Sequence, residues 1–331
     1  MIVRVFSYLF SAVLALGVAE SFAVADQNYP NRAITLVVPF TAGGAVDLVA
    51  RVVGNYASRT LGQPVVVENL PGAGGTIAAA HVARSTPDGY TILVGNLGTQ
   101  VSSVGNYKNL SYDPRRDFAP VILVANAPEV LLINKDLPTK TLKEFVVYTK
   151  EKGRALTFGS AGIGSISHLA YLLFSHLSHT SAEMVPYRGD PQADADLIAG
   201  RINAAFNQVV LASSFVTSGK LRALAIAAPR RSSILADVQS AVEAGMPDLQ
   251  VNAWTAFFFP RGTPPTIAER LNAVVQKALT DGAVLGRFAD LGVEIPPPDQ
   301  RSSSALEALV NSEFEKWLPL IQSAETPAKP Q

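Results

Sequence analysis

The sequence predicts an α/β protein with two lobes, in which mostly parallel sheets are flanked by helices and two extended segments cross between the lobes. Apolar runs of strand length alternate with longer helical patterns, an order typical of βαβ units. The chain has 331 residues, which is long for one small domain and suits two. Two long extended runs, 119–134 and 249–260, have no helix packed directly between their halves, as expected for segments that cross between lobes.

The first part of the chain alternates strands and helices in a regular order. The expected elements are the strand AITLVVPF (33–40), a helix over 46–60, the strand PVVVEN (64–69), a helix over 76–85, the strand YTILVGN (90–96) and the extended APVILVA and EVLLIN runs (119–134). Each strand is a short apolar run, and each run ends in turn residues before the next helical pattern begins.

The same alternation continues to the C-terminus. The expected elements are the strand ALTFGS (155–160), a helix over 165–177, the runs EMVPYRG (183–189) and RINAAFN (201–207) around a short helix at 191–200, the strands LRALAIAA (221–228) and LQVNAWTAFFFP (249–260), and helices over 266–279, 283–291 and 304–323. The final TPAKPQ is expected to be a frayed tail.

These elements predict a lobe built from both ends of the chain. We expect residues 28–124 and 253–325 to form one domain and residues 125–252 to form the other, with 1–25 removed as a signal peptide. No repeat with a period of 20–50 residues is visible, so a repeat architecture is not predicted.

The N-terminus has the pattern of a secretory signal peptide. Arg4 precedes an apolar stretch from Val5 to about Val18, and Ala23-Val24-Ala25 offers small residues for cleavage. A membrane anchor is the weaker alternative, because the stretch is shorter than the ~20 residues that span a bilayer. We therefore expect export to the periplasm and cleavage near Ala25.

Composition excludes several classes of function. The 27 Lys and Arg residues balance 27 Asp and Glu residues, so no electrostatic footprint argues for nucleic acid. The chain has no Cys, which excludes disulfides, thiolate metal sites and cysteine nucleophiles. Hydrophobic residues make up 48% and charged residues 16%, the balance of a well-packed soluble protein.

Glycine-rich loops follow several of the expected strands and precede helices. They are Gly43-Gly44, Gly72 to Gly75, the Gly95–Thr99 segment, and Ser160 to Ser165 in the second lobe. A helix N-terminus leaves N–H groups unpaired and carries partial positive charge, and glycine lets a ligand come close to them. One such loop is explained by a tight turn. Several at equivalent positions in two lobes predict a cleft for a carboxylate or phosphate, in which Asp47 orders its own loop.

Enzyme motifs are incomplete. No Walker lysine follows Gly72 to Gly75, and Gly162-Ile163-Gly164 lacks the third small residue and the acidic partner of a dinucleotide fingerprint. Ser160 lacks the preceding glycine of a nucleophile elbow, because position 158 is Phe. The four His residues show no metal-ligand spacing, so no metal site is predicted. Of the four, only His168 follows a glycine loop at the start of a helix.

Taken together, motifs from Tyr29 to about Ala324 resemble one family, the solute-binding proteins of tripartite tricarboxylate transporters, also called the Bordetella uptake gene (Bug) family. The residues that carry the resemblance are YPNRAITLVVPFTAGGAVDLVAR, LGQPVVVENLPGAGGTIAAAHVA, PDGYTILVGN, LSYDPRRDFAPVILVA, FGSAGIGSISHLA, VPYRGDPQADADLIAGRINAAF, SGKLRALAIAAPRRSS, EAGMPDLQVNAWTAFFFPRGTPPTIAERLN and FEKWLPLIQSA.

The resemblance implies a Venus-flytrap periplasmic-binding-protein fold that holds a small organic carboxylate and delivers it to membrane permease subunits. It implies a monomer with no cofactor. The candidate ligand-binding residues are Phe40, Thr41, Ala42, Gly43, Gly44, Asp47, Gly72, Ala73, Gly74, Gly75, Asn96 and Thr99 in one lobe, and Ser160, Gly162, Gly164, Ser165, His168, Tyr187, Gly189, Asp190 and Asn207 in the other.

The sequence departs from the family pattern in the second lobe. Arg188 stands where Lys is usual, Asp190 where a small residue is usual, and Asn207 where Asp is usual. These changes move a negative charge around the second lobe, so the far end of the ligand is expected to differ from that of common family ligands. A cap of the helix at 191–200 is the favoured role for Asp190.

Two other functions stay open from the sequence. The chain is also consistent with a ligand-dependent sensor that presents its closed form to a membrane signalling protein. A hydrolase using Ser160 or Ser165 with His168 is the weakest alternative, because it lacks both an elbow and a placed acid.

Overall fold

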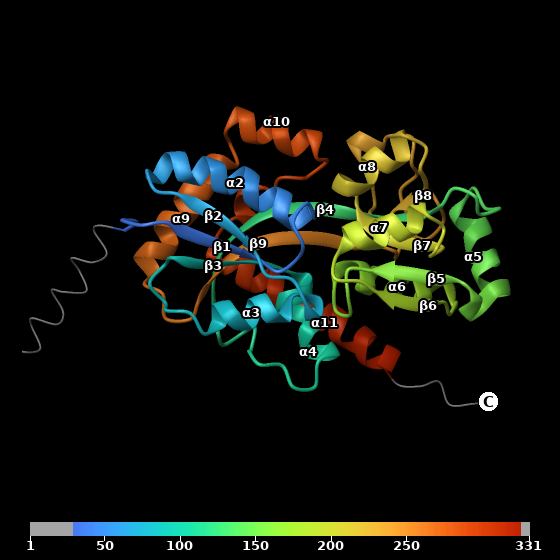
Figure 1. Ribbon diagram of the computed structural model, residues 1–331, viewed down its shortest axis with the longest axis horizontal. Coiled ribbons are helices and arrows are strands. Elements are labelled where there is room, and N and C mark those ends of the chain that lie inside the picture. The colour runs from blue at the N-terminus through green and yellow to red at the C-terminus, as the bar shows by residue number, and fades with distance from the viewer. Residues whose placement is uncertain (1–28, 326–331) are drawn as a thin grey trace, which may run out of the picture.

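The computed structural model describes residues 29–325. The expected signal peptide, 1–25, and the expected frayed tail, 326–331, lie outside the described residues. Within them the chain forms a two-lobed α/β structure around a nine-stranded sheet with the order β2-β1-β3-β9-β4-β7-β5-β6, in which β8 pairs with β4 off this path (Figure 1).

The first lobe contains three parallel strands that carry the N-terminal loops. Its strands are β1 (Ile34–Val38), β2 (Val65–Asn69) and β3 (Thr91–Asn96), and its helices include α2 (Ala45–Leu61), α3 (Thr76–Ala83), α9 (Pro265–Ala278) and α10 (Gly282–Asp290). β1 lies between β2 and β3 and pairs with both in parallel. The carboxyl ends of these strands therefore meet at one edge, where the Gly43 and Gly72 loops begin.

The second lobe repeats this arrangement. Its strands are β5 (Thr157–Ser160), β6 (Glu183–Pro186), β7 (Ala204–Gln208) and β8 (Leu221–Ile226), and its helices are α5 (Leu142–Lys152), α6 (Ile166–Ser178), α7 (Asp190–Ile198) and α8 (Val209–Thr217). β5 pairs in parallel with both β6 and β7. Its carboxyl end therefore directs the Ser160–Ser165 loop toward the first lobe.

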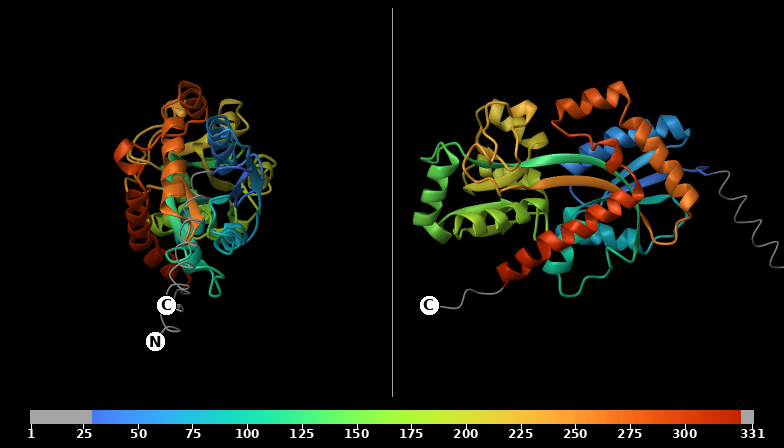
Figure 2. Two further views of the ribbon diagram at one scale, coloured as in Figure 1. Left: turned by 90° about the vertical axis from the view of Figure 1, so that its left-hand side faces the viewer. Right: turned by 180° about the vertical axis from the view of Figure 1, so that it is seen from behind.

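Two strands pass between the lobes. β4 (Phe118–Asn134) pairs antiparallel with β9 (Asn252–Pro260) from Phe118 to Pro128, and then with β7 and β8 from Glu129 onward. Both strands run along the long axis of the molecule in Figures 1 and 2. The pairings at the two ends of the sheet are parallel, whereas those of β4 and β9 are antiparallel.

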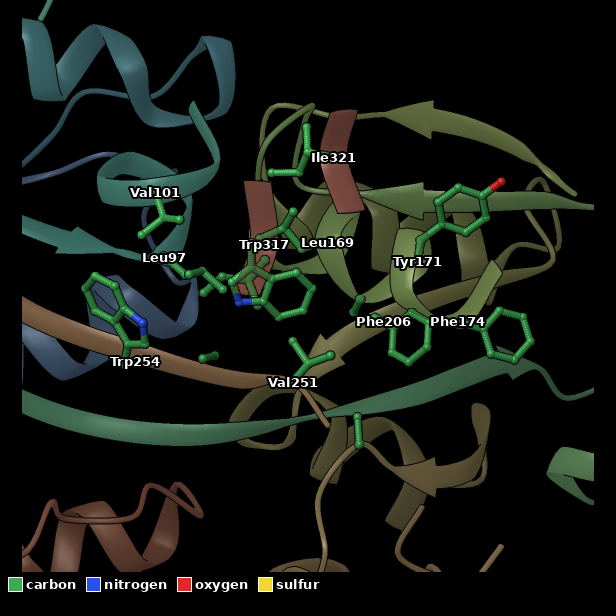
Figure 3. Packing of buried hydrophobic residues seen from close by; sticks show 14 of the residues in the cluster. Leu97, Val101, Leu169, Tyr171, Phe174, Phe206, Val251, Trp254, Trp317 and Ile321 are labelled. Carbon is green, nitrogen blue, oxygen red and sulfur yellow. The ribbon is translucent and has the colours of Figure 1, made fainter. Parts of the chain in front are cut away.

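The C-terminal helix α11 (Ser303–Glu325) packs beneath this junction. It contacts β4, the π-helical turn Gly98–Ser102, α4 (Ser103–Asn106) and α6 of the second lobe. Trp317 of α11 belongs to a buried cluster that also contains Trp254 of β9 and Phe206 of β7, as Figure 3 shows. One hydrophobic core therefore continues from the first lobe into the second.

The expected strands are all present, most of them with shorter ends, while β4 begins and β7 ends one residue beyond the expected runs. β6 ends at Pro186, three residues before the end of the expected run. Three helical segments were not predicted: α5, α8 and the turn at 98–106. α8 has the sequence VVLASSFVT, whose apolar and β-branched residues do not mark a helix face, and its position after β7 decides its conformation. Within residues 29–325, no helix is both long and apolar enough to cross a membrane.

Candidate functional site

One carboxylate fixes the conformation of the glycine loop between β1 and α2. Gly43 has φ of +83°, and Gly44 caps α2 without a side-chain hydrogen bond. Asp47 accepts hydrogen bonds from the Gly43 N–H and from Arg51 Nε, both at 2.9 Å. Burial raises the pKa of Asp47, but these bonds and one from Asn69 outweigh that effect and leave its pKa below the ordinary value. The Asp47 carboxylate therefore orders the loop.

The loop between β5 and α6 is ordered by its own serines and histidine. Ser165 caps α6 by accepting from the His168 N–H, and the Ser167 hydroxyl accepts from the Ala161 N–H at 2.9 Å. The Gly164 N–H donates to His168 Nδ1 at 3.1 Å. Burial lowers the pKa of His168 to about 4, so the imidazole is neutral near pH 7. His168 is thus a support of the loop, and its Nδ1 is not available as a base for Ser165.

The N-termini of α2 and α6 both border one small pocket between the lobes. The first N–H groups of a helix have no intrahelical partner, so both termini can donate to an anion in this space. None of the lining residues is Lys, Arg or His. The pocket is lined by Phe40, Thr41, Gly44, Ala45, Val46 and Asn96 of the first lobe, and by Glu129, Ala161, Ser165, Ile166, Ser167, Asp190, Pro191 and Gln208.

Three carboxyl groups lie at the second-lobe side of this pocket. Glu129 of β4 and Asp190 of α7 line it, and Asp194 lies one turn further along α7. Burial raises the pKa of all three, to about 6 for Asp190 and about 8 for Asp194, and the charges of Asp190 and Asp194 raise the pKa of Glu129 further. Asn207 Nδ2 donates to both Asp194 oxygens, at 2.7 and 2.8 Å.

Loops of the two lobes also contact each other directly beside the pocket. The Tyr107 hydroxyl donates to the Ile163 carbonyl at 3.0 Å, and the Ser102 hydroxyl donates to the Gly164 carbonyl. A side chain at Gly74 would overlap the Ile163 carbonyl. A second pocket lies at this contact, lined by residues 72–74, 161–163 and 186–188 with Tyr107. The structure therefore has its lobes in contact around the pocket.

The predicted site residues divide into three groups. Phe40, Thr41, Gly44, Asn96, Ser165 and Asp190 line the pocket at the two helix N-termini. Gly72, Ala73, Gly74, Gly162 and Tyr187 line the second pocket. Ala42, Gly43, Asp47, Gly75, Thr99, Ser160, Gly164, His168, Gly189 and Asn207 line neither.

The third group supports the loops. Thr99 and Asn96 bond each other through side chains and backbone, Ser160 accepts from the Gly162 N–H, and Asn207 holds Asp194. Gly72, Ala73 and Gly74 do not line the pocket at the N-termini of α2 and α6, and the Gly74 loop packs on Ile163 instead.

Asp190 requires a correction, and two polar lining residues outside the predicted loops were missed. Gly189 is the N-cap of α7 and Asp190 makes no capping bond, so the favoured cap role is wrong. Its Oδ1 instead lies 3.5 Å from the Ser167 hydroxyl. Glu129 and Gln208 were missed. A charged residue inside the otherwise apolar run APEVLLIN was the available signal, since a buried strand rarely carries an unpaired Glu.

Comparison with known proteins identifies the family. Residues 49–325 match the model of the tripartite tricarboxylate transporter family receptor, TctC. The chain belongs to this family. Its members are periplasmic solute-binding proteins rather than enzymes, and their fold is the two-lobed one described above.

Solved structures of relatives are similar in both sequence and fold. MatC from Rhodopseudomonas palustris, solved with bound malate, is 41% identical, with 88% of this chain and 100% of that chain covered and a TM-score of 0.85. The periplasmic binding protein BugD is 34% identical, with 89% and 98% covered and a TM-score of 0.84. A Rhodopseudomonas palustris protein solved with adipate is 31% identical, with 90% and 98% covered and a TM-score of 0.85.

Proposed function

We propose that this protein captures a small organic carboxylate in the pocket between its lobes and delivers it to the membrane permease subunits of a tripartite tricarboxylate-type transporter. The observation that carries the proposal is the approach of two helix N-termini, from α2 and α6, to one pocket whose lining residues include no cationic side chain. Backbone N–H groups at helix N-termini bind carboxylates through charge-assisted hydrogen bonds.

The relatives support this proposal. Two proteins of the same fold were solved with malate and with adipate, both small carboxylates. The hydrogen bonds within each loop of this chain hold the N–H groups in place before a ligand arrives, which reduces the entropic cost of binding. The expected signal peptide would place this capture in the periplasm. Capture and delivery of a ligand require binding alone, with no catalytic activity.

A proline at the first position of α2 tests the carboxylate grip. Ala45→Pro removes one N–H at the pocket, while Gly44, with φ of −74° and ψ of 163°, already has a conformation that suits a residue before proline. We expect a loss of ~1.5–3 kcal/mol in binding, the range for a hydrogen bond to a charged group. Calorimetry with a carboxylate found by a thermal-shift screen measures it.

The matched control is Gly282→Pro, at the first position of α10 and remote from the pocket. Equal carboxylate affinity in the Ala45→Pro and Gly282→Pro proteins would contradict the grip at α2. Failure of every carboxylate in the screen to bind would contradict the proposed function itself. Export is tested separately, by sequencing the N-terminus of the mature protein from the periplasm, which is expected near Asp26.

A further inference from the structure

One end of the pocket is lined by carboxyl groups, with no cationic side chain among the lining residues. Glu129 is 1% exposed and lines the pocket, and its Oε2 has no hydrogen-bond partner among the described residues. Asp190 lines the same wall. A buried carboxylate oxygen without a partner costs free energy, so this wall is built to receive a donor.

No cation on the described elements around Glu129 is placed to balance it: Arg222 of β8 lies opposite Ile133 and donates to the Leu137 and Thr139 carbonyls. α7 contributes Asp190 and Asp194, β7 contributes the uncharged Asn207 and Gln208, and β9 carries no charged residue. α6 contributes His168, which is neutral near pH 7. In the first lobe, Arg51 is paired with Asp47, and none of the described residues that line the pocket is Lys or Arg.

The N-terminus of α7 differs from those of α2 and α6. Its first residue is Asp190 and its second is Pro191, which has no N–H. A carboxylate side chain and a missing donor make this helix end unsuitable for an anion, although it borders the same pocket. The pocket therefore has an anion-binding end at α2 and α6 and a cation-binding end at Glu129 and Asp190.

We propose that the ligand is an amino carboxylate, whose carboxylate binds at the N-termini of α2 and α6 and whose protonated amine binds between Glu129 and Asp190. This inference rests on the proposed function and adds the substrate class to it. An ammonium group has three N–H donors, one of which can bond the unpartnered Glu129 Oε2. Its positive charge also balances Glu129 and Asp190, whereas a second ligand carboxylate would be repelled by them.

Proton exchange distinguishes an amino carboxylate from a dicarboxylate. Burial raises the pKa of Asp190 to about 6, and that of Glu129 is also raised. A bound ammonium favours the charged carboxylates, so protons leave and affinity rises with pH. A second carboxylate has the opposite effect: protons enter, and affinity falls with pH.

Matched ligand pairs test the inference in the full mature protein. Succinate with 3-aminopropanoate, glutarate with 4-aminobutyrate, and adipate with 5-aminopentanoate differ only in replacing one carboxylate by an ammonium group. We expect the amino member of at least one pair to bind at least tenfold more tightly at pH 7.5, and its affinity to rise between pH 5.5 and pH 8. Calorimetry in buffers of different ionisation enthalpy measures the protons released.

Variants locate the ammonium site. Glu129→Gln should lower the affinity for the amino ligand at least tenfold and leave that for its dicarboxylate partner unchanged or tighter. Asp190→Ser should act in the same direction, and provides a second variant if Glu129→Gln does not fold. Glu151→Gln, an exposed residue of α5, is the matched control and should change neither affinity.

The outcomes separate this inference from the proposed function. Tighter binding of the dicarboxylate in every pair, or proton uptake when the amino ligand binds, would overturn the ammonium site and leave the carboxylate-binding function intact. Equal loss for both members of a pair in Glu129→Gln would also overturn it. No binding by any carboxylate, with or without an amine, would overturn both.

Discussion

Gly74 lies where the loops of the two lobes meet. Its φ is +62°, and a Cβ there would overlap the Ile163 carbonyl of the second lobe. We expect Gly74→Ala to cost ~1–3 kcal/mol in ligand binding, because a non-glycine residue in this conformation is strained and the lobes cannot approach as closely. Calorimetry with a carboxylate that binds the wild type measures the loss.

Gly286→Ala is the matched control for this change. Gly286 lies in α10 with open space around its Cα and an ordinary φ, so the same substitution should leave binding unchanged. Gly43 gives an intermediate case, since its φ is +83° but no atom lies within 4 Å of the added Cβ. Wild-type affinity in Gly74→Ala would mean that the Gly74–Ile163 contact is not part of the bound state.

Asp194 makes stability depend on pH. Burial, and then the charge of Asp190, raise its pKa to about 8. The folded state therefore binds more protons than the unfolded state between about pH 4 and pH 8, so this group's contribution to stability decreases as pH rises through that window. Asp194→Asn should reduce the loss of unfolding free energy between pH 5 and pH 8, by up to ~1.4 kcal/mol per pH unit.

Urea unfolding at several pH values measures this slope. Asp299→Asn, in an exposed turn, is the control and should keep the wild-type slope. An unchanged slope in Asp194→Asn would mean that Asp194 is already charged in the folded state near neutral pH.

Single residues differ in how well the sequence predicts them. The sequence indicates Gly43 and Asp47 as site residues. Two glycines between a strand and a helix cost backbone entropy, and a ligand that must come close to the backbone explains why they are there. The Asp47 bond to the Gly43 N–H confirms its ordering role. Glu129 was not predicted as a site residue. It becomes one because β4 passes beside α7, and a local sequence pattern does not show which helix a strand will contact. Asp190 was found, but its cap role was wrong for the same reason.

At the scale of elements, α11 connects the packing of the two lobes. Trp317 is 1% exposed and packs in the cluster that contains residues of both lobes. We expect Trp317→Ala to lower the free energy of unfolding by ~3–5 kcal/mol, the range for removing a large buried aromatic side chain. Val147→Ala, at a position 52% exposed, should change it by less than ~0.5 kcal/mol.

Chemical denaturation of both variants in the absence of ligand measures this difference. A loss below ~1 kcal/mol in Trp317→Ala would show that the neighbouring side chains collapse into the cavity, so that α11 adds little to the shared core. Retained ligand affinity together with lower stability is the expected combination, because Trp317 does not line the pocket.

Elements were predicted best where amphipathic or apolar runs have clear ends. β1, β2 and β3 match the expected strands within a few residues, and α2 ends at Leu61 before Gly62, which adopts a left-handed conformation. The turn at 98–106 overlaps the Gly95–Thr99 segment, which was expected to be a glycine loop. It becomes helical through packing against α11, which a single-sequence pattern does not contain.

At the scale of the whole molecule, the two long extended runs predicted the crossing strands, and β4 and β9 are these strands. The sequence did not predict that the hydrophobic core continues across the junction. The division at 124–125 and 252–253 stays a prediction, which limited proteolysis of the ligand-free protein can test.

Closure of the lobes leads to the last prediction. A ligand stabilises the closed state only through contacts made in that state, so a cross-lobe bond should contribute to affinity without touching the ligand. The Tyr107 hydroxyl makes such a bond to the Ile163 carbonyl. Tyr107→Phe should therefore weaken carboxylate binding by ~0.5–1.5 kcal/mol, the net value of one hydrogen bond, with small-angle scattering showing a larger average radius at subsaturating ligand. Tyr148→Phe, in α5 and far from the junction, should behave as the wild type. Unchanged affinity in Tyr107→Phe would mean that this bond is equally present in the open state, and closure would then depend on the ligand and on the other contacts between the lobes, such as Ser102–Gly164 and Gly74–Ile163.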